Sequence, residues 1–350
     1  MSERSAWVDY AKAIGVFLLV YGHVARGVFH AGIQIDETLY RLTDSIIYSF
    51  HMPLFFFLSG LFFCGSLNKR GPTGVFASKV DTIVYPYLLW SILQGTLEAS
   101  LSSHTNSNIS YSDVFALLWQ PRAQFWFLYA LFMIFTLATL VFSKAPDKLA
   151  LPVFAASICA YIFQADIPSA FHLNFITNNF VFFVFGILLR RWSESDWLAS
   201  KYLLLAAFAG FIGSQYLFHG ILGLSYVHKG GLSLWVALAS ILFIVALSKN
   251  LAKKPAAWFR LIGSSSMAIY LMHILAGSGT RIVLMDIFNV NSSSVHLAAG
   301  CVIGIAAPLL IAQLISRYRI PFVFSLPISR FTYDCYSRLF RKNAGASVPD

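Results

Sequence analysis

Long apolar stretches recur along almost the whole chain, and they limit the folds that it can adopt. Of its 350 residues, 58% are hydrophobic and only 11% are charged, whereas a soluble domain carries about 25% charged residues. An apolar stretch of roughly 17–25 residues is long enough to cross a bilayer as a helix. We therefore predict an all-α polytopic membrane protein, a bundle of about ten transmembrane helices. The predicted spans are 11–31, 44–65, 81–101, 123–142, 149–165, 174–190, 201–218, 231–248, 262–284 and 296–316.

The positions of Lys and Arg predict the orientation of these spans. With the N-terminus inside, the outer segments hold only a few of the 25 Lys and Arg residues, namely Arg26, Arg41, Arg122, Lys229 and Arg281. Cytoplasmic segments of membrane proteins carry such an excess of positive charge, so both termini are predicted to be cytoplasmic. The net charge of +10 follows from this topology, and no nucleic-acid partner is expected. Residues 1–325 are predicted to form one membrane domain, and 326–350 a short basic cytoplasmic tail.

Two ionisable residues of the first predicted span, Lys12 and His23, are eleven positions apart. Eleven residues make about three helical turns, so both side chains lie on one face, separated by a rise of ~16 Å. An ionisable group within a membrane is a candidate functional residue, and Asp9 is spaced to pair with Lys12 on the helix surface. The alternatives are that Lys12 anchors the helix at the lipid headgroups and that His23 only packs against another helix.

The second and ninth predicted spans also carry polar side chains. His51 lies two residues before Pro53, which interrupts the helical hydrogen bonds, and Ser59 precedes a glycine. Ser266, Tyr270 and His273 fall at i, i+4 and i+7, which places them on one helix face. The candidates for a supporting role are His51, Ser59, Tyr270 and His273, together with Asp9. The alternative for His51 is a packing kink, and for the ninth span hydrogen bonding between helices.

Cations outside the first span suggest two further binding surfaces. Lys69, Arg70 and Lys79 are predicted to be cytoplasmic and are candidates for binding phosphate, although the positive-inside rule explains them equally well. Arg122 lies at the predicted outer face near Trp126, where a cation and an aromatic ring suit a saccharide. The four cysteines contain no C-x-x-C pair and the histidines lack metal-ligand spacing, so no metal is expected.

These residues together resemble the acyltransferase-3 family of integral membrane acyltransferases. The resemblance is to the branch with fucose 4-O-acetylase-like and exopolysaccharide acetyltransferases. The family pattern of a cation, ten residues and a histidine matches Lys12 and His23, and a second pattern matches His51 through Gly60. Further matches are Pro86-Tyr87 with Trp90, Trp126 through Leu128, and Gly263 through His273. Two departures are Lys12, where the family often has Arg, and Thr82, where many members have a second cation after Lys79.

The resemblance implies an acyltransferase-3-type domain over residues 1–325 and transfer of an acyl group from cytoplasmic acyl-CoA to a hydroxyl. The expected acceptor is a sugar of an exopolysaccharide, an O-antigen or a lipid-linked glycan, and the expected location is the bacterial inner membrane. Acetyl-CoA is then a substrate, no bound cofactor is expected, and membrane lipid is the surrounding partner. The oligomeric state stays open.

The resulting hypothesis makes His23 the general base and Lys12 a second catalytic residue near the donor. An imidazole near its usual pKa accepts and donates protons at working pH. Lys69, Arg70 and Lys79 would bind acyl-CoA, and Arg122 and Trp126 the acceptor. The alternatives are a transporter of a lipid-linked saccharide or small metabolite, transfer of succinyl instead of acetyl, a non-glycan acceptor, and an acyl-His intermediate.

Overall fold

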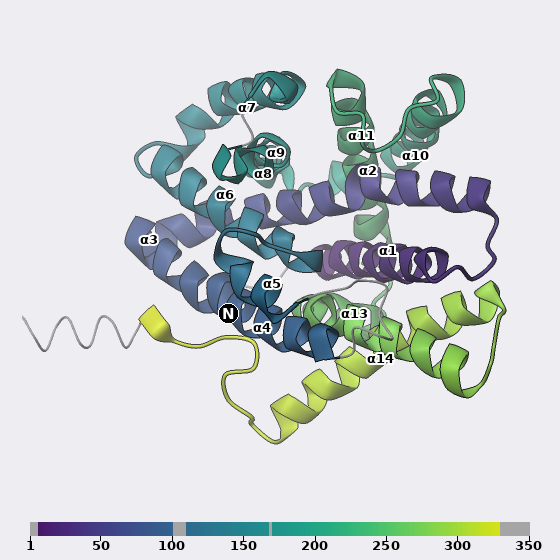
Figure 1. The fold of residues 1–350 in the computed structure, drawn as a ribbon. Coiled ribbons are helices and arrows are strands. Elements are labelled where there is room, and N and C mark those ends of the chain that lie inside the picture. The colour runs from purple at the N-terminus through teal and green to yellow at the C-terminus, as the bar shows by residue number, and fades with distance from the viewer. Residues whose placement is uncertain (1–5, 101–109, 168–169, 330–350) are drawn as a thin grey trace, which may run out of the picture.

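The computed structural model describes residues 6–100, 110–167 and 170–329, and these form an all-helical bundle (Figure 1). Its α-helices are α1 (Ala6–His30), α2 (Glu37–Leu61), α3 (Phe63–Lys79), α4 (Tyr85–Ser100), α5 (Tyr111–Phe115), α6 (Trp126–Phe142), α7 (Pro146–Ile162), α8 (Leu173–Thr177), α9 (Phe180–Leu189), α10 (Lys201–Gln215), α11 (Gly231–Leu251), α12 (Ala257–Ser264), α13 (Ser266–Ile282) and α14 (Ser293–Arg317). Single π-helical segments follow α3, α10 and α13 at Val80–Val84, Tyr216–Ile221 and Val283–Ile287. Most of the predicted tail, from residue 330, lies outside the described residues.

Seven helical segments of this part of the chain are long and apolar enough to cross a membrane. They are Ala6–His30, Tyr111–Phe142, Leu173–Trp192, Lys201–Ile221, Gly231–Leu251, Ser266–Ile287 and Ser293–Arg317. An eighth is the pair Glu37–Leu61 and Phe63–Ser100, bent by 63°. The prediction from the sequence was about ten spans, because the two arms of this bent pair were counted separately. The prediction also counted α7, which at 17 residues is at the lower limit of the length that crosses a bilayer.

Helix α1 lies at the centre of the bundle, where it contacts α2, α11, α12, α13 and α14 (Figure 1). Small residues permit the closest contacts, as is usual between membrane helices. A Cβ atom built at Gly263 of α12 would lie 1.8 Å from the Asp9 carbonyl oxygen of α1. A Cβ atom at Gly60 of α2 would lie 1.9 Å from the Phe183 carbonyl oxygen of α9. The helix backbones therefore touch at these points, which only glycine allows.

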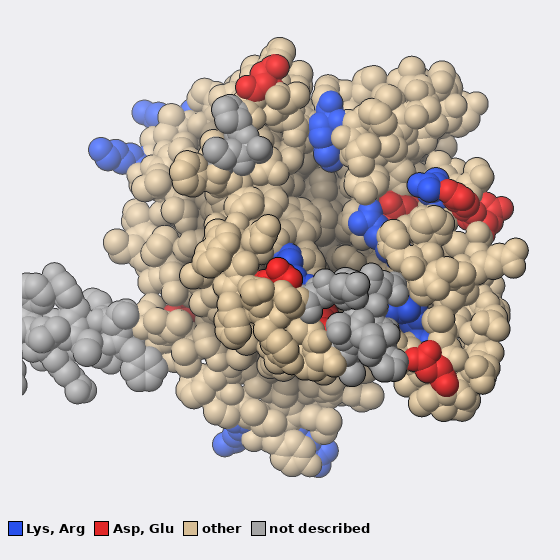
Figure 2. All heavy atoms as spheres, in the orientation of Figure 1, with Lys and Arg blue, Asp and Glu red and all other residues tan. Residues whose placement is uncertain are grey.

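Phenylalanine rings fill the space between α2, α3, α6 and α9. Phe63 and Phe183 are completely buried, with ring centroids 5.5 Å apart in an edge-to-face arrangement, and Phe135 lies 5.1 Å from Phe183. Such edge-to-face contacts add to the energy of burial. On the outside, Leu140 and Val302 are 72% and 65% exposed. Figure 2 shows the Lys and Arg side chains as small separate groups on a face that is mostly uncharged, as expected where lipid covers the protein.

Candidate functional site

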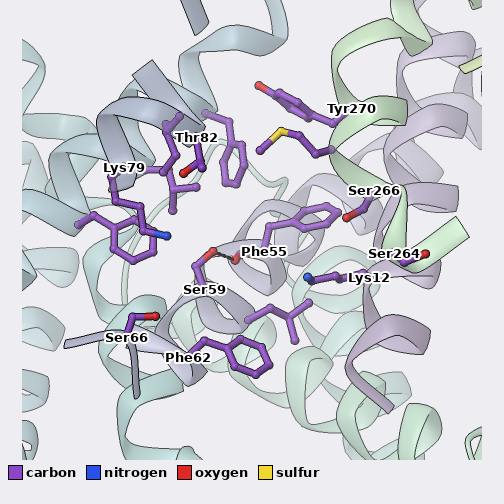
Figure 3. Close-up of a pocket in the computed structure, with 16 residues that line it drawn as sticks. Lys12, Phe55, Ser59, Phe62, Ser66, Lys79, Thr82, Ser264, Ser266 and Tyr270 are labelled. Atoms are coloured by element: carbon purple, nitrogen blue, oxygen red, sulfur yellow. Dashed lines mark hydrogen bonds between the residues drawn. The ribbon is translucent and has the colours of Figure 1, made fainter. Parts of the chain in front are cut away.

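A cavity of about 350 Å³ lies beside the first turns of α1 (Figure 3). Its walls come from α1, the end of α2, the end of α3, α6, and the adjoining ends of α12 and α13. Aromatic rings, including Phe55, Phe127 and Phe135, form most of the apolar surface. The polar side chains come from Lys12, Ser59, Ser66, Lys79, Thr82, Ser264, Ser266 and Tyr270. We call this space the Lys12 cavity.

Two lysines from different helices point into the Lys12 cavity. The amino groups of Lys12 and Lys79 approach it from opposite walls in Figure 3. Lys79 Nζ lies 4.0 Å from the centroid of the Phe135 ring, a cation–π distance. Both candidate lysines therefore face one space, although they are far apart in the sequence.

The two candidate hydroxyls that line the Lys12 cavity both donate to main-chain carbonyls. Ser59 Oγ donates to Phe55 O at 2.9 Å, and the Tyr270 hydroxyl donates to Gln124 O. Tyr270 is 7% exposed and its ring lies 5.6 Å from that of Phe127. Both hydroxyl protons are therefore used within the protein, where they hold the cavity wall.

His23 lines a second, smaller cavity of about 180 Å³, formed by α1, α13 and α14. The ring centroid of His23 lies 5.0 Å from that of His273. His273 is 1% exposed, its Nδ1 lies 2.8 Å from Tyr270 O and 3.1 Å from Ile269 O, and its Nε2 has no partner among the described residues. We call this space the His23 cavity.

The two cavities lie at successive levels of the same helices. Lys12 stands near the start of α1 and His23 in its second half, so the predicted rise of ~16 Å separates the two cavities along the helix. On α13, Tyr270 lines the first cavity and His273 the second, and their ring centroids are only 6.3 Å apart. The Tyr270 and His273 rings are therefore neighbours on α13, and each lines one of the two cavities.

A charged network that the sequence analysis missed lies beside His23. Arg26 donates to both carboxylate oxygens of Asp44, at 2.7 and 2.9 Å, and to the Tyr226 hydroxyl at 3.0 Å. Its guanidinium stacks 3.3 Å above the ring of Tyr48, and that ring lies 4.5 Å from His51. The sequence did contain a signal for this network, because Asp44 is an acidic residue at the start of a predicted apolar span. An acid in that environment needs a partner of opposite charge.

His51 lies next to this network and lines neither cavity. The side chain is completely buried, and Nδ1 lies 2.9 Å from Ile47 O, which leaves Nε2 without a partner among the described residues. The link between His51 and His23 runs through Tyr48, whose ring centroid lies 6.3 Å from that of His23. A supporting role for His51 would therefore be indirect.

The remaining candidates lie away from both cavities. Lys69 and Arg70 are exposed on α3, and Arg122 pairs with Glu98 at 2.8 Å. The Trp126 ring packs against Phe127 and Phe175. The Asp9 side chain is buried and does not line the Lys12 cavity. The binding roles of these residues stay predictions. Within the described residues, no group of three or more His, Cys, Asp or Glu side chains is placed to hold a metal ion.

Comparison with known proteins gives the class of this helical bundle. The acyltransferase-3 family model, described as an acyltransferase domain, matches residues 5–313. The chain therefore belongs to the acyltransferase-3 family and is an integral membrane protein.

Two relatives carry the printed name Nodulation protein NolL. The protein from Mesorhizobium japonicum is 25% identical over 224 residues, which are 61% of this chain and 57% of the relative. The protein from Sinorhizobium fredii is 27% identical over 151 residues, which are 40% of this chain and 37% of the relative. The chain thus matches less than two thirds of the length of either relative. No solved structure matches this chain.

Proposed function

We propose that this protein transfers an acetyl group from cytoplasmic acetyl-CoA to a hydroxyl of a saccharide, with His23 as the general base. The observation that carries the proposal is the position of His23 at a second cavity, on the same helix as Lys12. The neighbouring rings of His273 and Tyr270 connect this cavity to the Lys12 cavity. Membership of the acyltransferase-3 family supports acyl transfer as the reaction. The proposed location is the bacterial inner membrane, with both termini in the cytoplasm.

The Lys12 cavity is the proposed donor site. It lies where α1 begins and α2 ends, which is the cytoplasmic side in the topology predicted from Lys and Arg. Its volume is at the lower end of the range for small-molecule pockets, so it suits the pantetheine arm, with the phosphates of CoA nearer the mouth. Lys12 and Lys79 are the two ammonium groups on its wall and would attract those phosphates.

The His23 cavity is the proposed acceptor site, and the reaction takes place between the two cavities. His23 takes the proton from the acceptor hydroxyl while the hydroxyl oxygen attacks the thioester carbonyl carbon. The carbon–sulfur bond then breaks, and the imidazolium returns the proton to the thiolate of CoA. The thioester has to pass the ring of Tyr270 to reach His23, so donor binding would move that side chain. The acceptor belongs to an exopolysaccharide, an O-antigen or a lipid-linked glycan.

The test is transfer of radiolabelled acetyl from acetyl-CoA into glycolipid and polysaccharide, in membranes that contain wild type or His23→Ala. Loss of a general base is expected to reduce transfer about 10²–10⁴-fold. His30→Ala is the matched control, because His30 is an exposed histidine of the same helix and should retain wild-type transfer.

Either of two results would contradict the proposal. Near-normal transfer by an equally expressed His23→Ala variant would remove the general-base role. A wild-type protein that transfers no acetyl to any acceptor, but moves a saccharide across the membrane, would be a transporter instead.

A further inference from the structure

The His23 cavity has a cationic wall without a carboxylate. Its ionisable lining residues are three histidines, His23, His273 and His296, and Arg281. Asp and Glu are absent from the lining residues that the structure describes. The positive charge of Arg281 is therefore not balanced from within the cavity.

Arg281 differs in this respect from the two other largely buried arginines of the predicted outer side. Arg26 pairs with Asp44 at 2.7 Å, and Arg122 pairs with Glu98 at 2.8 Å. Arg281 is 8% exposed, and its Nε has no hydrogen-bond partner among the described residues. The charge of Asp286 on the following turn acts on Arg281, but neither Asp286 nor another carboxylate of the described residues forms an ion pair with it. A buried charge without an ion-pair partner costs several kcal/mol, and such groups within membranes usually serve a binding or transport role. An anionic ligand would remove this cost.

Two histidines that line the same cavity each have one ring nitrogen without a partner among the described residues. His296 is 1% exposed, and its Nε2 lies 2.8 Å from Val290 O, so Nε2 carries the proton of the neutral ring. His296 Nδ1 is then an acceptor, and it has no partner among the described residues. In His273 the two nitrogens have exchanged roles. Nδ1 donates to main-chain carbonyls, and Nε2 is the acceptor without a partner among the described residues. Two buried acceptors suit a ligand with several hydroxyl groups.

The dimensions of the cavity fit one sugar ring. Glycines form part of the wall, and a Cβ atom at Gly27 would meet only Arg281 Nε, at 4.0 Å. Gly27 lies one turn beyond His23 on α1, which is a rise of ~6 Å. The Arg281 side chain therefore lies beside the turn of α1 that follows His23.

We propose that the His23 cavity binds an acidic sugar unit of the acceptor, one that carries a carboxylate or a phosphate group. Arg281 binds the anionic group as a planar fork, while His273 Nε2 and His296 Nδ1 accept hydrogen bonds from ring hydroxyls. The hydroxyl to be acetylated then faces His23. This inference rests on the proposed function for the identity of the cavity as the acceptor site, but its test measures binding and needs no transfer.

The experiment is thermal unfolding of the full-length protein in detergent with four small ligands. They are methyl β-D-glucoside, methyl β-D-glucuronide, methyl β-D-glucoside 6-phosphate and glycerol 3-phosphate. A ligand that binds only the folded state raises Tm in proportion to its occupancy, by about 2 °C or more at ten times its Kd. We expect one or both anionic sugars to raise the Tm of wild type, and the glucoside and glycerol 3-phosphate to leave it unchanged.

Two variants link the binding to this cavity. Arg281→Gln should abolish the shift with anionic sugars, whereas Arg41→Gln should keep it, because Arg41 is an exposed arginine paired with Glu37 on α2. Gly27→Leu should also abolish the shift, since the side chain fills the cavity. Gly210→Leu is its control, because a Cβ atom at Gly210 on α10 meets nothing within 4 Å. A Tm increase with acetyl-CoA, retained in every variant, shows that each variant is folded.

The inference is overturned if the glucoside raises Tm as much as the anionic sugars do, or if Arg281→Gln and Gly27→Leu both keep the shift. It is also overturned if glycerol 3-phosphate matches the sugar phosphate, because the site would then bind a lipid headgroup. A response to the glucuronide alone or to the sugar phosphate alone identifies which anion is bound. Binding of an anionic sugar by a protein that transfers no acetyl group would contradict the proposed function and leave this inference standing.

Discussion

Lys79 and Lys69 belong to one group of cations predicted to be cytoplasmic, yet at the residue scale they have different surroundings. Lys79 lines the Lys12 cavity, with Nζ 4.0 Å from the Phe135 ring centroid, whereas Lys69 is exposed and away from it. A hydrogen bond to a charged group contributes about 1.5–3 kcal/mol. We therefore expect Lys79→Met to raise the KM for acetyl-CoA about tenfold or more and Lys69→Met to change it little.

Steady-state kinetics over a range of acetyl-CoA concentrations in membranes would check this prediction. Lys79→Arg keeps the positive charge and should retain most of the affinity. If Lys69→Met raised the KM as much as Lys79→Met, the phosphates would be bound on the exposed surface of α3 and not at the cavity.

At the scale of helices, close backbone contacts hold the site together. Gly263 places α12 directly against α1 at Asp9, one turn before Lys12. A Cβ atom at Gly263 would lie 1.8 Å from the Asp9 carbonyl oxygen, so Gly263→Ala should force the two helices apart. Overpacking of this kind costs about 1–3 kcal/mol or more, and we expect a lower Tm for the variant in detergent.

Gly65→Ala is the control for this prediction, because a Cβ atom at Gly65 meets nothing within 4 Å. Alanine is the better helix former by up to ~1 kcal/mol, so Tm should stay the same or rise. An equal Tm for Gly263→Ala and wild type would show that α1 and α12 can move apart without a loss of stability.

At the scale of the whole molecule, the chain after α14 returns to the beginning of α4. Trp90 Nε1 donates to Val323 O at 3.0 Å, and the Tyr85 hydroxyl donates to Phe322 O at 2.7 Å. The Asp81 carboxylate accepts hydrogen bonds from the main chain and the hydroxyl of Ser329, at 2.9 and 2.5 Å. The segment after Arg317 is therefore held against the start of α4 and against the π-helical segment Val80–Val84, part of which lines the Lys12 cavity.

Asp81→Ala should release this segment and speed trypsin cleavage after Arg319, because opening exposes the backbone to the protease. Quantification of the tail fragment by mass spectrometry over time would measure the effect. Asp166→Ala, at an exposed position between α7 and α8, should leave the rate unchanged. Equal cleavage rates for Asp81→Ala and wild type would show that the other contacts hold the segment alone.

The sequence by itself determined the features that depend on local periodicity. Long apolar stretches predicted a helical membrane protein, and the eleven-residue spacing of Lys12 and His23 predicted a shared helix face, since helical geometry depends only on spacing along the chain. Motif order also predicted the acyltransferase-3 family, which the comparison confirmed.

Only the tertiary structure decided which side chains meet. It separated Lys12 and His23 into two cavities, paired Arg26 with Asp44, and brought Arg281 and His296 to the cavity of His23. These side-chain contacts depend on which helices pack together. Helix packing in turn follows from the shapes of surfaces formed by residues distant in the sequence. Lipid is as apolar as the helices themselves, so hydrophobicity places each helix in the membrane but does not choose its neighbours.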